Sequence, residues 1–155
     1  MFRISKESDY GVLLLTLLAR GPDSVSISAR ELARKSGIPL PMVSKILKLL
    51  ARGGVLSSKR GPKGGYALTR RPDRISVAEV VAALEGPLSI TECIEHPGDC
   101  RQETTCGIRG NWAVINTVVQ EALSRVSLVE MTRPFRDRQL IPLQTQESER
   151  WIRYR

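Results

Sequence analysis

The sequence predicts a mainly α-helical protein in which short helices, one hairpin and one long helix follow one another. Apolar residues recur at helical spacing in several segments, and a glycine-rich turn joins two short extended runs near the middle of the chain. Gly and Pro residues mark the ends of these segments. With 155 residues and 41% hydrophobic side chains, the chain can bury one ordinary core and a small appendage.

The first helix is expected over residues 5–20. Asp9 lies in its first turn, where a carboxylate is favourable beside the helix N-terminus. Leucines at helical spacing predict its core face, namely Leu13, Leu14, Leu17 and Leu18.

Residues 29–52 predict two short helices joined by a tight turn that contains a glycine. The first helix, over residues 29–35, begins at a capping box of Ser28 and Glu31. The second is expected over residues 41–52. Such a pair forms a helix-turn-helix, whose second helix places its N-terminal residues against base edges in the major groove of DNA. The residues expected to face outward from it are Pro41, Met42, Ser44, Lys45 and Lys48.

A hairpin follows directly, with strands expected over residues 55–59 and 65–69. Its turn is basic and rich in glycine, and a hairpin after a helix-turn-helix is a wing whose tip contacts phosphates or enters the minor groove. A phosphate-cradling nucleotide loop is the alternative, but the P-loop spacing and its Ser or Thr are missing. The residues expected to contact DNA are Ser28, Pro41, Met42, Ser44, Lys45, Lys48, Lys59, Arg60, Pro62, Lys63 and Tyr66.

The positive charge of the chain is concentrated in this segment. Residues 30–71 contain eleven Lys or Arg and one acid, which gives +10. Because the whole chain carries +8, the remainder sums to −2. A surplus confined to one segment indicates a polyanion as the partner, although a merely solvated basic surface is the plainer alternative.

The C-terminal half predicts a helix over residues 76–84, opened by a capping box of Ser76 and Glu79, and a long helix over residues 111–127. The apolar face of the long helix could be covered by the chain's own core or by a second copy. We favour dimerisation, because a helix-turn-helix protein that binds a palindromic operator needs two-fold pairing. This face comprises Trp112, Ile115, Val118, Val119, Ala122, Leu123 and Val126.

We expect three parts: a winged helix-turn-helix DNA-binding domain (residues 1–75), a loop and dimerisation helix (residues 76–131), and a polar, poorly ordered tail (residues 132–155). No apolar run is long enough to span a bilayer, and the N-terminus has no signal-peptide pattern. We therefore expect a cytoplasmic protein.

All three cysteines lie in one segment, with the spacing C-x6-C-x5-C. Gly, Pro, Asp and Thr fill the intervals, so an irregular loop is expected. Clustered cysteines in a cytoplasmic chain favour metal or redox chemistry over a structural disulfide. Zinc prefers closer pairs, a thiol switch needs only two cysteines, and an iron–sulfur cluster tolerates wider spacing between soft thiolate ligands. The cysteines are Cys93, Cys100 and Cys106.

Several stretches together resemble the IscR and NsrR family of winged-helix iron–sulfur regulators, over roughly residues 1–131. They are residues 3–6 with Asp9-Tyr10-Gly11, residues 40–45, the wing from Arg60 to Tyr66, and the three-cysteine loop. Residues 83–87, 91–93 and 109–112 look most like regulators of the SUF iron–sulfur assembly operon. The resemblance implies a winged helix-turn-helix with a long helix that crosses its partner in a homodimer.

The resemblance also implies that Cys93, Cys100 and Cys106 ligate a [2Fe-2S] or [4Fe-4S] cluster. IscR-like members carry a histidine three residues after the last cysteine, but this chain has Arg109, which cannot bind iron. NsrR-like members can use an aspartate from the partner's first helix, and Asp9 falls at that position. We rank Asp9 of the other subunit first as the fourth ligand, ahead of His96, Asp99, a nearby glutamate or a small molecule.

The resulting hypothesis is an iron–sulfur-sensing, DNA-binding transcription regulator that represses iron–sulfur assembly genes as a homodimer. The alternatives are a winged-helix regulator that uses its cysteines as a thiol or zinc switch, and a metal-loop adaptor for another protein. An enzyme is not expected, because the sequence offers no convergent acid–base or nucleophile constellation.

Overall fold

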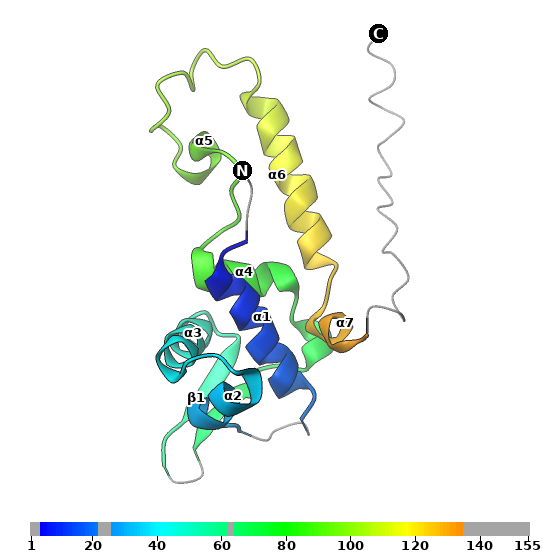
Figure 1. Ribbon diagram of the computed structural model, residues 1–155. Coiled ribbons are helices and arrows are strands. Elements are labelled where there is room, and N and C mark those ends of the chain that lie inside the picture. The colour runs from blue at the N-terminus through cyan, green and yellow to red at the C-terminus, as the bar shows by residue number, and fades with distance from the viewer. Residues whose placement is uncertain (1–3, 22–25, 62–63, 135–155) are drawn as a thin grey trace.

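The computed structural model describes residues 4–21, 26–61 and 64–134. Pro62, Lys63 and most of the tail that we predicted to be poorly ordered lie outside these ranges. The mainly helical fold class is confirmed (Figure 1). The elements are α1 (Lys6–Ala19), α2 (Ala29–Ser36), α3 (Leu40–Arg52), β1 (Leu56–Lys59), β2 (Gly65–Leu68), the 3₁₀ turn η1 (Pro72–Arg74), α4 (Val77–Glu85), α5 (Glu92–Glu95), α6 (Arg109–Ser124) and α7 (Leu128–Thr132).

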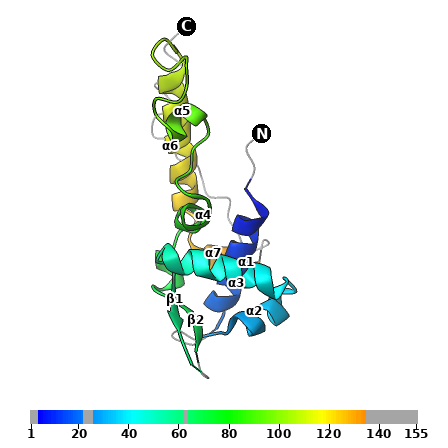
Figure 2. The ribbon, with the colours of Figure 1, turned by 90° about the vertical axis from the view of Figure 1, so that its left-hand side faces the viewer.

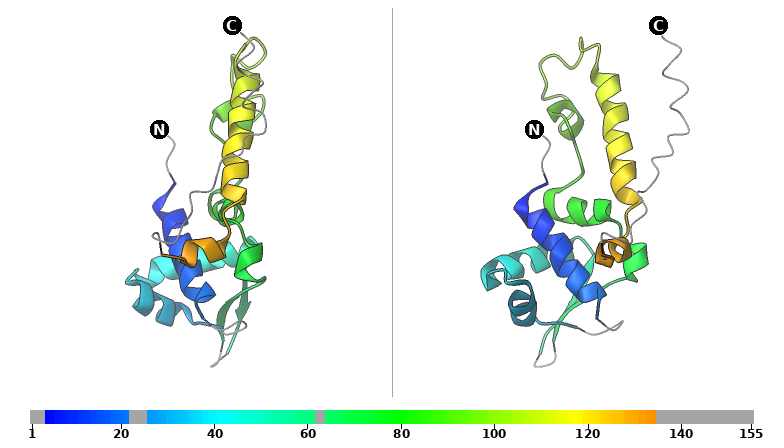
Figure 3. Two further views of the ribbon diagram at one scale, coloured as in Figure 1. Left: turned by 90° about the vertical axis from the view of Figure 1, so that its right-hand side faces the viewer. Right: turned by 45° about the vertical axis from the view of Figure 1, so that its right-hand side comes forward.

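The molecule divides into a head and an arm. The head comprises residues 4–85 and 126–134, and the arm comprises residues 86–125. In the three orientations of Figures 1, 2 and 3, α6 and the cysteine loop project away from the head, at the end opposite the hairpin. No described helix is long and apolar enough to cross a membrane.

Local capping explains where α1 and α2 begin. Ser5 and Ser28 each accept a hydrogen bond from a backbone N–H three residues on, at 3.2 Å in both cases. At Ser28 the serine half of the predicted capping box is therefore present. The Glu31 carboxylate, which was expected to supply the other half, pairs instead with Lys35 at 2.8 Å. That pair holds the pKa of Glu31 below its usual value. Gly37 ends α2 with φ +72°, a conformation that favours glycine.

One hydrophobic core occupies the head, beneath α1, α3 and the hairpin. Leu13 was expected in this core, but it is exposed, and Leu15 is buried in its place. The periodicity therefore gave the right helix with its inward face displaced by part of a turn. The core comprises Leu14, Leu15, Leu18, Ile27, Leu32, Ile38, Val43, Ile46, Leu47, Leu50, Val55, Leu56, Ile75, Val80 and Leu128.

The hairpin is tied to the segment that precedes α2. Its antiparallel register runs from the pair Leu56–Leu68 to Lys59–Gly65. Ile27 and Tyr66 exchange two backbone hydrogen bonds of 2.9 Å, which fixes β2 against the head. A Cβ at Gly65 would lie 2.6 Å from the Ile27 carbonyl oxygen, so this close approach requires glycine.

Two capping boxes join the arm to the head. Ser76 with Glu79 begins α4, and Ser127 with Glu130 begins α7. The two serines form an isolated antiparallel bridge, so the chain leaves and re-enters the head at adjacent points. Its two backbone bonds, each 2.8 Å, run from Val77 N to Val126 O and from Leu128 N to Ile75 O.

Candidate DNA-binding surface and cysteine loop

The recognition helix α3 turns its predicted contact residues toward solvent only in part. Pro41, Lys45 and Lys48 are exposed, as the pattern predicts. Met42 and Ser44 are half-buried, and Met42 packs against the core. Met42 and Ser44 are therefore only partly accessible from solvent, and their contact with DNA stays a prediction.

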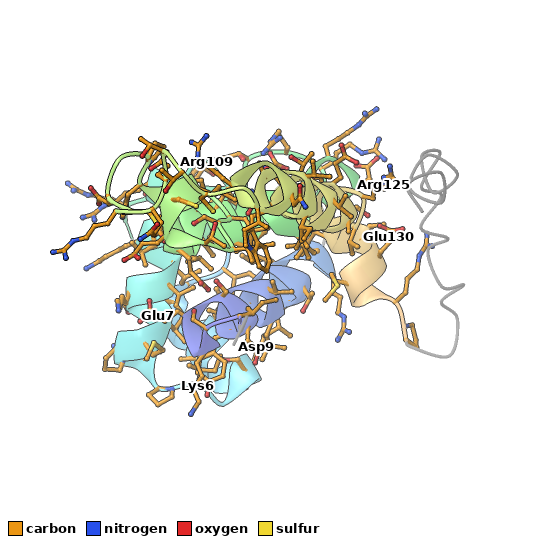
Figure 4. All side chains as sticks on the ribbon, turned by 90° about the horizontal axis from the view of Figure 1, so that it is seen from above. Lys6, Glu7, Asp9, Arg109, Arg125 and Glu130 are labelled. Carbon is orange, nitrogen blue, oxygen red and sulfur yellow. The ribbon has the colours of Figure 1, made fainter. Side chains whose placement is uncertain are left out.

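Lys45 forms an ion pair with Glu7, in the first turn of α1. Figure 4 shows Glu7 on the side of α1 that faces α3. The carboxylate therefore neutralises a cation that the helix-turn-helix would offer to DNA. The pair also connects α3 to the helix turn that carries Asp9.

The remaining predicted contacts differ in how accessible they are. Lys59 and Arg60 are exposed at the end of β1. Ser28 is exposed while its hydroxyl caps α2. Tyr66 is half-buried and packs against the core, so the side chain anchors the wing to the head. Pro62 and Lys63 lie outside the described residues.

The cysteine loop is less irregular than the sequence suggested. Cys93 lies in the short helix α5, where it is buried, and its Sγ lies 3.4 Å from the Thr91 hydroxyl oxygen. Cys100 and Cys106 are half-buried in the following turns. His96 is exposed, so in this arrangement it is directed toward solvent.

Two turns follow the second and third cysteines. The Glu103 N–H donates to the Cys100 carbonyl oxygen at 3.0 Å, and the Arg109 N–H donates to the Cys106 carbonyl oxygen at 3.4 Å. The Glu103 carboxylate joins these turns, because it pairs with the Arg109 guanidinium at 2.8 Å and accepts from the Gly98 N–H at 2.6 Å. The sequence did not single out Glu103, because nothing in the residues around it shows with which basic side chain it forms an ion pair.

Asn116 fastens the start of the loop to α6. Asn116 is buried in α6. Its side chain supplies hydrogen-bond partners to the backbone of residues 88–90, which lie just before the cysteine loop. The Ile90 N–H donates to Asn116 Oδ1 at 3.0 Å, and Asn116 Nδ2 donates to the Leu88 carbonyl oxygen at 3.2 Å. An asparagine within an apolar helix is the signal from which the sequence could have predicted this anchor.

The donor chemistry fits an iron–sulfur cluster, because three thiols are the soft ligands that iron–sulfur sites use. The geometry of one chain does not complete such a site: within the described ranges, no three His, Cys, Asp or Glu side chains lie where one metal ion could reach them. Asp9 is exposed in the first turn of α1 and available to another molecule (Figure 4).

A shallow apolar groove of about 380 Å³ runs along α6. Ile115 and Val118 are 44% and 45% exposed there, although the pattern predicted an apolar face that something should cover. Within the described residues, the chain's own packing therefore covers the predicted face only in part, because Trp112, Val119, Ala122, Leu123 and Val126 are half-buried. The groove is lined by Asn111, Val114, Ile115, Val118 and Val119.

Comparison with known proteins gives consistent relatives. The chain is 28% identical over 131 residues to the HTH-type transcriptional regulator IscR of Xenorhabdus nematophila, covering 84% of this chain and 79% of that protein. Among solved structures it resembles CymR, the global cysteine regulator of B. subtilis (TM-score 0.66, 26% identity, 85% and 97% of the two chains). It also resembles T. potens IscR (TM-score 0.61, 25% identity, 84% and 85%).

The family model described as Rrf2, iron-dependent transcriptional regulator, matches residues 4–134. This match covers the head, the arm and both capping-box junctions. It confirms the predicted relation to IscR-type regulators and a DNA-binding, non-enzymatic role. The chain therefore belongs to the Rrf2 family of helix-turn-helix transcription regulators.

Proposed function

We propose that this regulator is a homodimer that senses an iron–sulfur cluster and represses iron–sulfur assembly genes in the cytoplasm. The observation that carries the proposal is the position of all three cysteines in one loop of the arm, remote from the recognition helix. A soft-ligand loop at a site distinct from the DNA-binding surface suits a sensor, because ligand binding at one site can then be coupled to DNA affinity at the other.

The groove on α6 supplies the dimer surface. An apolar helix face that the head leaves exposed is stabilised when a second copy covers it. Two-fold pairing through α6 would present two recognition helices to half-sites about one helical turn apart, around 34 Å, on a palindromic operator.

Cys93, Cys100 and Cys106 would hold the cluster, with the partner subunit's Asp9 as the fourth ligand. Three observations support this assignment: the three thiols share one loop, Arg109 occupies the position of the family's histidine, and Asp9 is exposed. The cluster, when bound, would supply a redox- and iron-dependent link between subunits. It can alter DNA affinity only to the extent that it is more stable in one arrangement of the two heads than in the other.

A thiol switch is the second candidate. It is favoured by the geometry of a single chain, because the described residues bring no three His, Cys, Asp or Glu side chains to one metal position, whereas a disulfide needs only two thiols. The chain also resembles CymR, the global cysteine regulator of B. subtilis, and not only IscR. In this case oxidation of two thiols, not cluster loss, would be the signal.

The deciding experiment is an anaerobic ultraviolet–visible spectrum with iron and sulfide assays after reconstitution, on wild type, Cys100→Ala and Asp9→Ala. Brown wild-type protein that contains both iron and sulfide, together with a folded and colourless Cys100→Ala variant, supports the cluster. Loss of colour in Asp9→Ala supports the cross-subunit ligand. Wild type that stays colourless but forms a disulfide with oxidised glutathione would establish the thiol switch instead.

DNA binding can be tested separately through Lys48, an exposed lysine of the recognition helix. Replacing Lys48 with Ala should weaken operator binding and reduce the slope of log K against log salt by about 0.9, as the loss of one phosphate contact predicts. Lys6→Ala is the matched control, because Lys6 is an exposed lysine of α1 outside the helix-turn-helix. Equal losses in both variants would show that Lys48 acts only through overall charge.

A further inference from the structure

We propose that Glu103 and Arg109 are positioning residues that close the cysteine loop before any cluster is bound. This inference rests on the proposed function, since it concerns how Cys100 and Cys106 are set toward a common ligand. It gives a structural reason for Arg109 at a position where the resemblance leads one to expect a histidine ligand.

The first support is the symmetry of the two turns. Glu103 and Arg109 each lie three residues after a cysteine, and each donates its N–H to that cysteine's carbonyl oxygen. The ion pair between their side chains, at 2.8 Å, therefore joins the turn of Cys100 to the turn of Cys106. Loss of the ion pair should therefore change the relative positions of the Cys100 and Cys106 thiols and leave the head unchanged.

The second support is the way in which Glu103 is held. Its side chain is only 16% exposed, although it belongs to a surface loop. One carboxylate oxygen meets Arg109, and the other accepts from the Gly98 N–H at 2.6 Å. A carboxylate that accepts two such bonds is fixed in position, unlike an exposed ion pair between two mobile side chains.

The third support is the turn that presents Gly98. The Asp99 N–H donates to the His96 carbonyl oxygen at 3.2 Å, with Pro97 and Gly98 between them. Gly98 has φ +100°, as the third residue of a type II turn requires, so its N–H is directed by the backbone itself. Glu103 thus connects three turns of the loop, at residues 96–99, 100–103 and 106–109.

Two consequences follow for the site. Arg109 is engaged by Glu103, so the loop is closed without a fourth protein ligand from its own chain. Because both oxygens of the Glu103 carboxylate are engaged, this glutamate is not offered as the fourth ligand, in agreement with Asp9 of the partner subunit as an exchangeable ligand.

The test measures alkylation of each cysteine by iodoacetamide in the cluster-free full-length protein, resolved by mass spectrometry. Glu103→Ala removes both contacts, and Glu103→Gln keeps an acceptor for Gly98 but loses the charge. Alkylation of Cys100 and Cys106 should rise on the order of tenfold in Glu103→Ala, as the loss of a charge-assisted hydrogen bond predicts, while Cys93 stays unchanged. Glu103→Gln and Arg109→Gln each remove the ion pair, so the two variants should show a similar rise in alkylation of Cys100 and Cys106. Arg109→Lys keeps the positive charge and should retain most of the wild-type protection.

Glu95→Gln is the control, because it removes a carboxylate of the same loop that lies 3.9 Å from exposed His96 and outside the three turns. The proposal is overturned if Glu103→Ala alkylates at the wild-type rate, or if Cys93 accelerates equally, which would indicate general unfolding of the arm. Failure of Arg109→Lys to restore protection would also contradict it.

A second readout separates this proposal from the cluster. After anaerobic reconstitution, EDTA is added and the visible absorbance of the cluster is followed. This absorbance should decay several-fold faster in Glu103→Ala than in wild type. If wild-type protein takes up no cluster, the proposed function fails, while the alkylation rates still decide the role of Glu103. If the cluster forms and both readouts match wild type, only the positioning role is wrong.

Discussion

The head and the arm of this regulator are stabilised in different ways. The head buries a continuous apolar core that runs through α1, α2, α3, the hairpin and α7. In the arm, which the structure describes completely, only Cys93 and Asn116 are buried, and neither is a large apolar side chain. Its helix α6 leaves apolar residues exposed along the groove.

This difference indicates that the head and the arm have different roles in the protein. The head contains the interactions that define its own structure, so it can present the recognition helix on a packed core. The arm depends on single polar connections and on whatever covers α6, so its conformation can respond to a ligand or to a second subunit.

The largest effect that tests this comparison is expected in the head. Leu47→Ala should lower the free energy of unfolding by about 2–5 kcal/mol, because the side chain is fully buried (0% exposed) and its removal leaves a cavity. Leu40→Ala, in the same helix at 40% exposure, should change it by less than about 0.5 kcal/mol. Urea denaturation at fixed protein concentration measures both. Similar losses would mean that the core does not dominate the stability of the head.

The next effect concerns the groove. Val118→Asp should raise the dimer dissociation constant by roughly 30- to 150-fold, which corresponds to about 2–3 kcal/mol for placing a charge in an apolar interface. Sedimentation velocity over a concentration series gives the constant. Gln120→Asp is the control, because it adds the same charge to an exposed residue on another face of α6. If Val118→Asp leaves the dimer intact, the groove is not its interface.

A smaller, local effect is expected at Asn116. Asn116→Leu should leave the Ile90 N–H and the Leu88 carbonyl without partners, at a cost of about 1–3 kcal/mol for each unsatisfied group that stays buried. Hydrogen exchange should therefore accelerate at residues 88–93 and remain unchanged in α3. The exposed residue Gln120 supplies the control variant Gln120→Leu. Uniform acceleration across the head would contradict a local anchor.

The smallest effect is a pH dependence at the junction. A backbone hydrogen bond from Ser76 lowers the pKa of Glu79 most, burial opposes this, and Arg70, at 2.7 Å, lowers it further. Because the folded pKa lies below the ordinary value of 4.5, the stabilisation is present above that pH and is lost as pH falls through the folded pKa.

Glu79→Gln should accordingly lower the thermal midpoint relative to wild type at about pH 7 and lose most of this difference at about pH 3. Differential scanning calorimetry at both pH values measures it. Glu121→Gln, whose pair with Arg125 is longer at 3.8 Å, should show little difference at either pH. A deficit in Glu79→Gln that is the same at both pH values would mean that ionisation of Glu79 does not contribute.

The elements of the head could be predicted because their causes are local. The starts of α1 and α2 follow from serines that cap a backbone N–H three residues on, the turn after α2 follows from glycine, and the core face of α3 follows from apolar spacing. The same local patterns predicted α4 and the long helix to within a few residues. Cysteine spacing located the loop and its candidate ligands.

The tertiary structure decided which faces are covered and which charges meet. Helical periodicity gave α1 an apolar side, but the packing of α3, α4 and α7 determined that Leu15 is buried and Leu13 exposed. The Glu7–Lys45 pair joins residues 38 positions apart, and the bonds of Asn116 span 26 and 28 positions. A sequence pattern records preferences within a few residues of each position. Contacts between distant residues depend on how the whole chain closes around its core, and only the folded molecule fixes that arrangement.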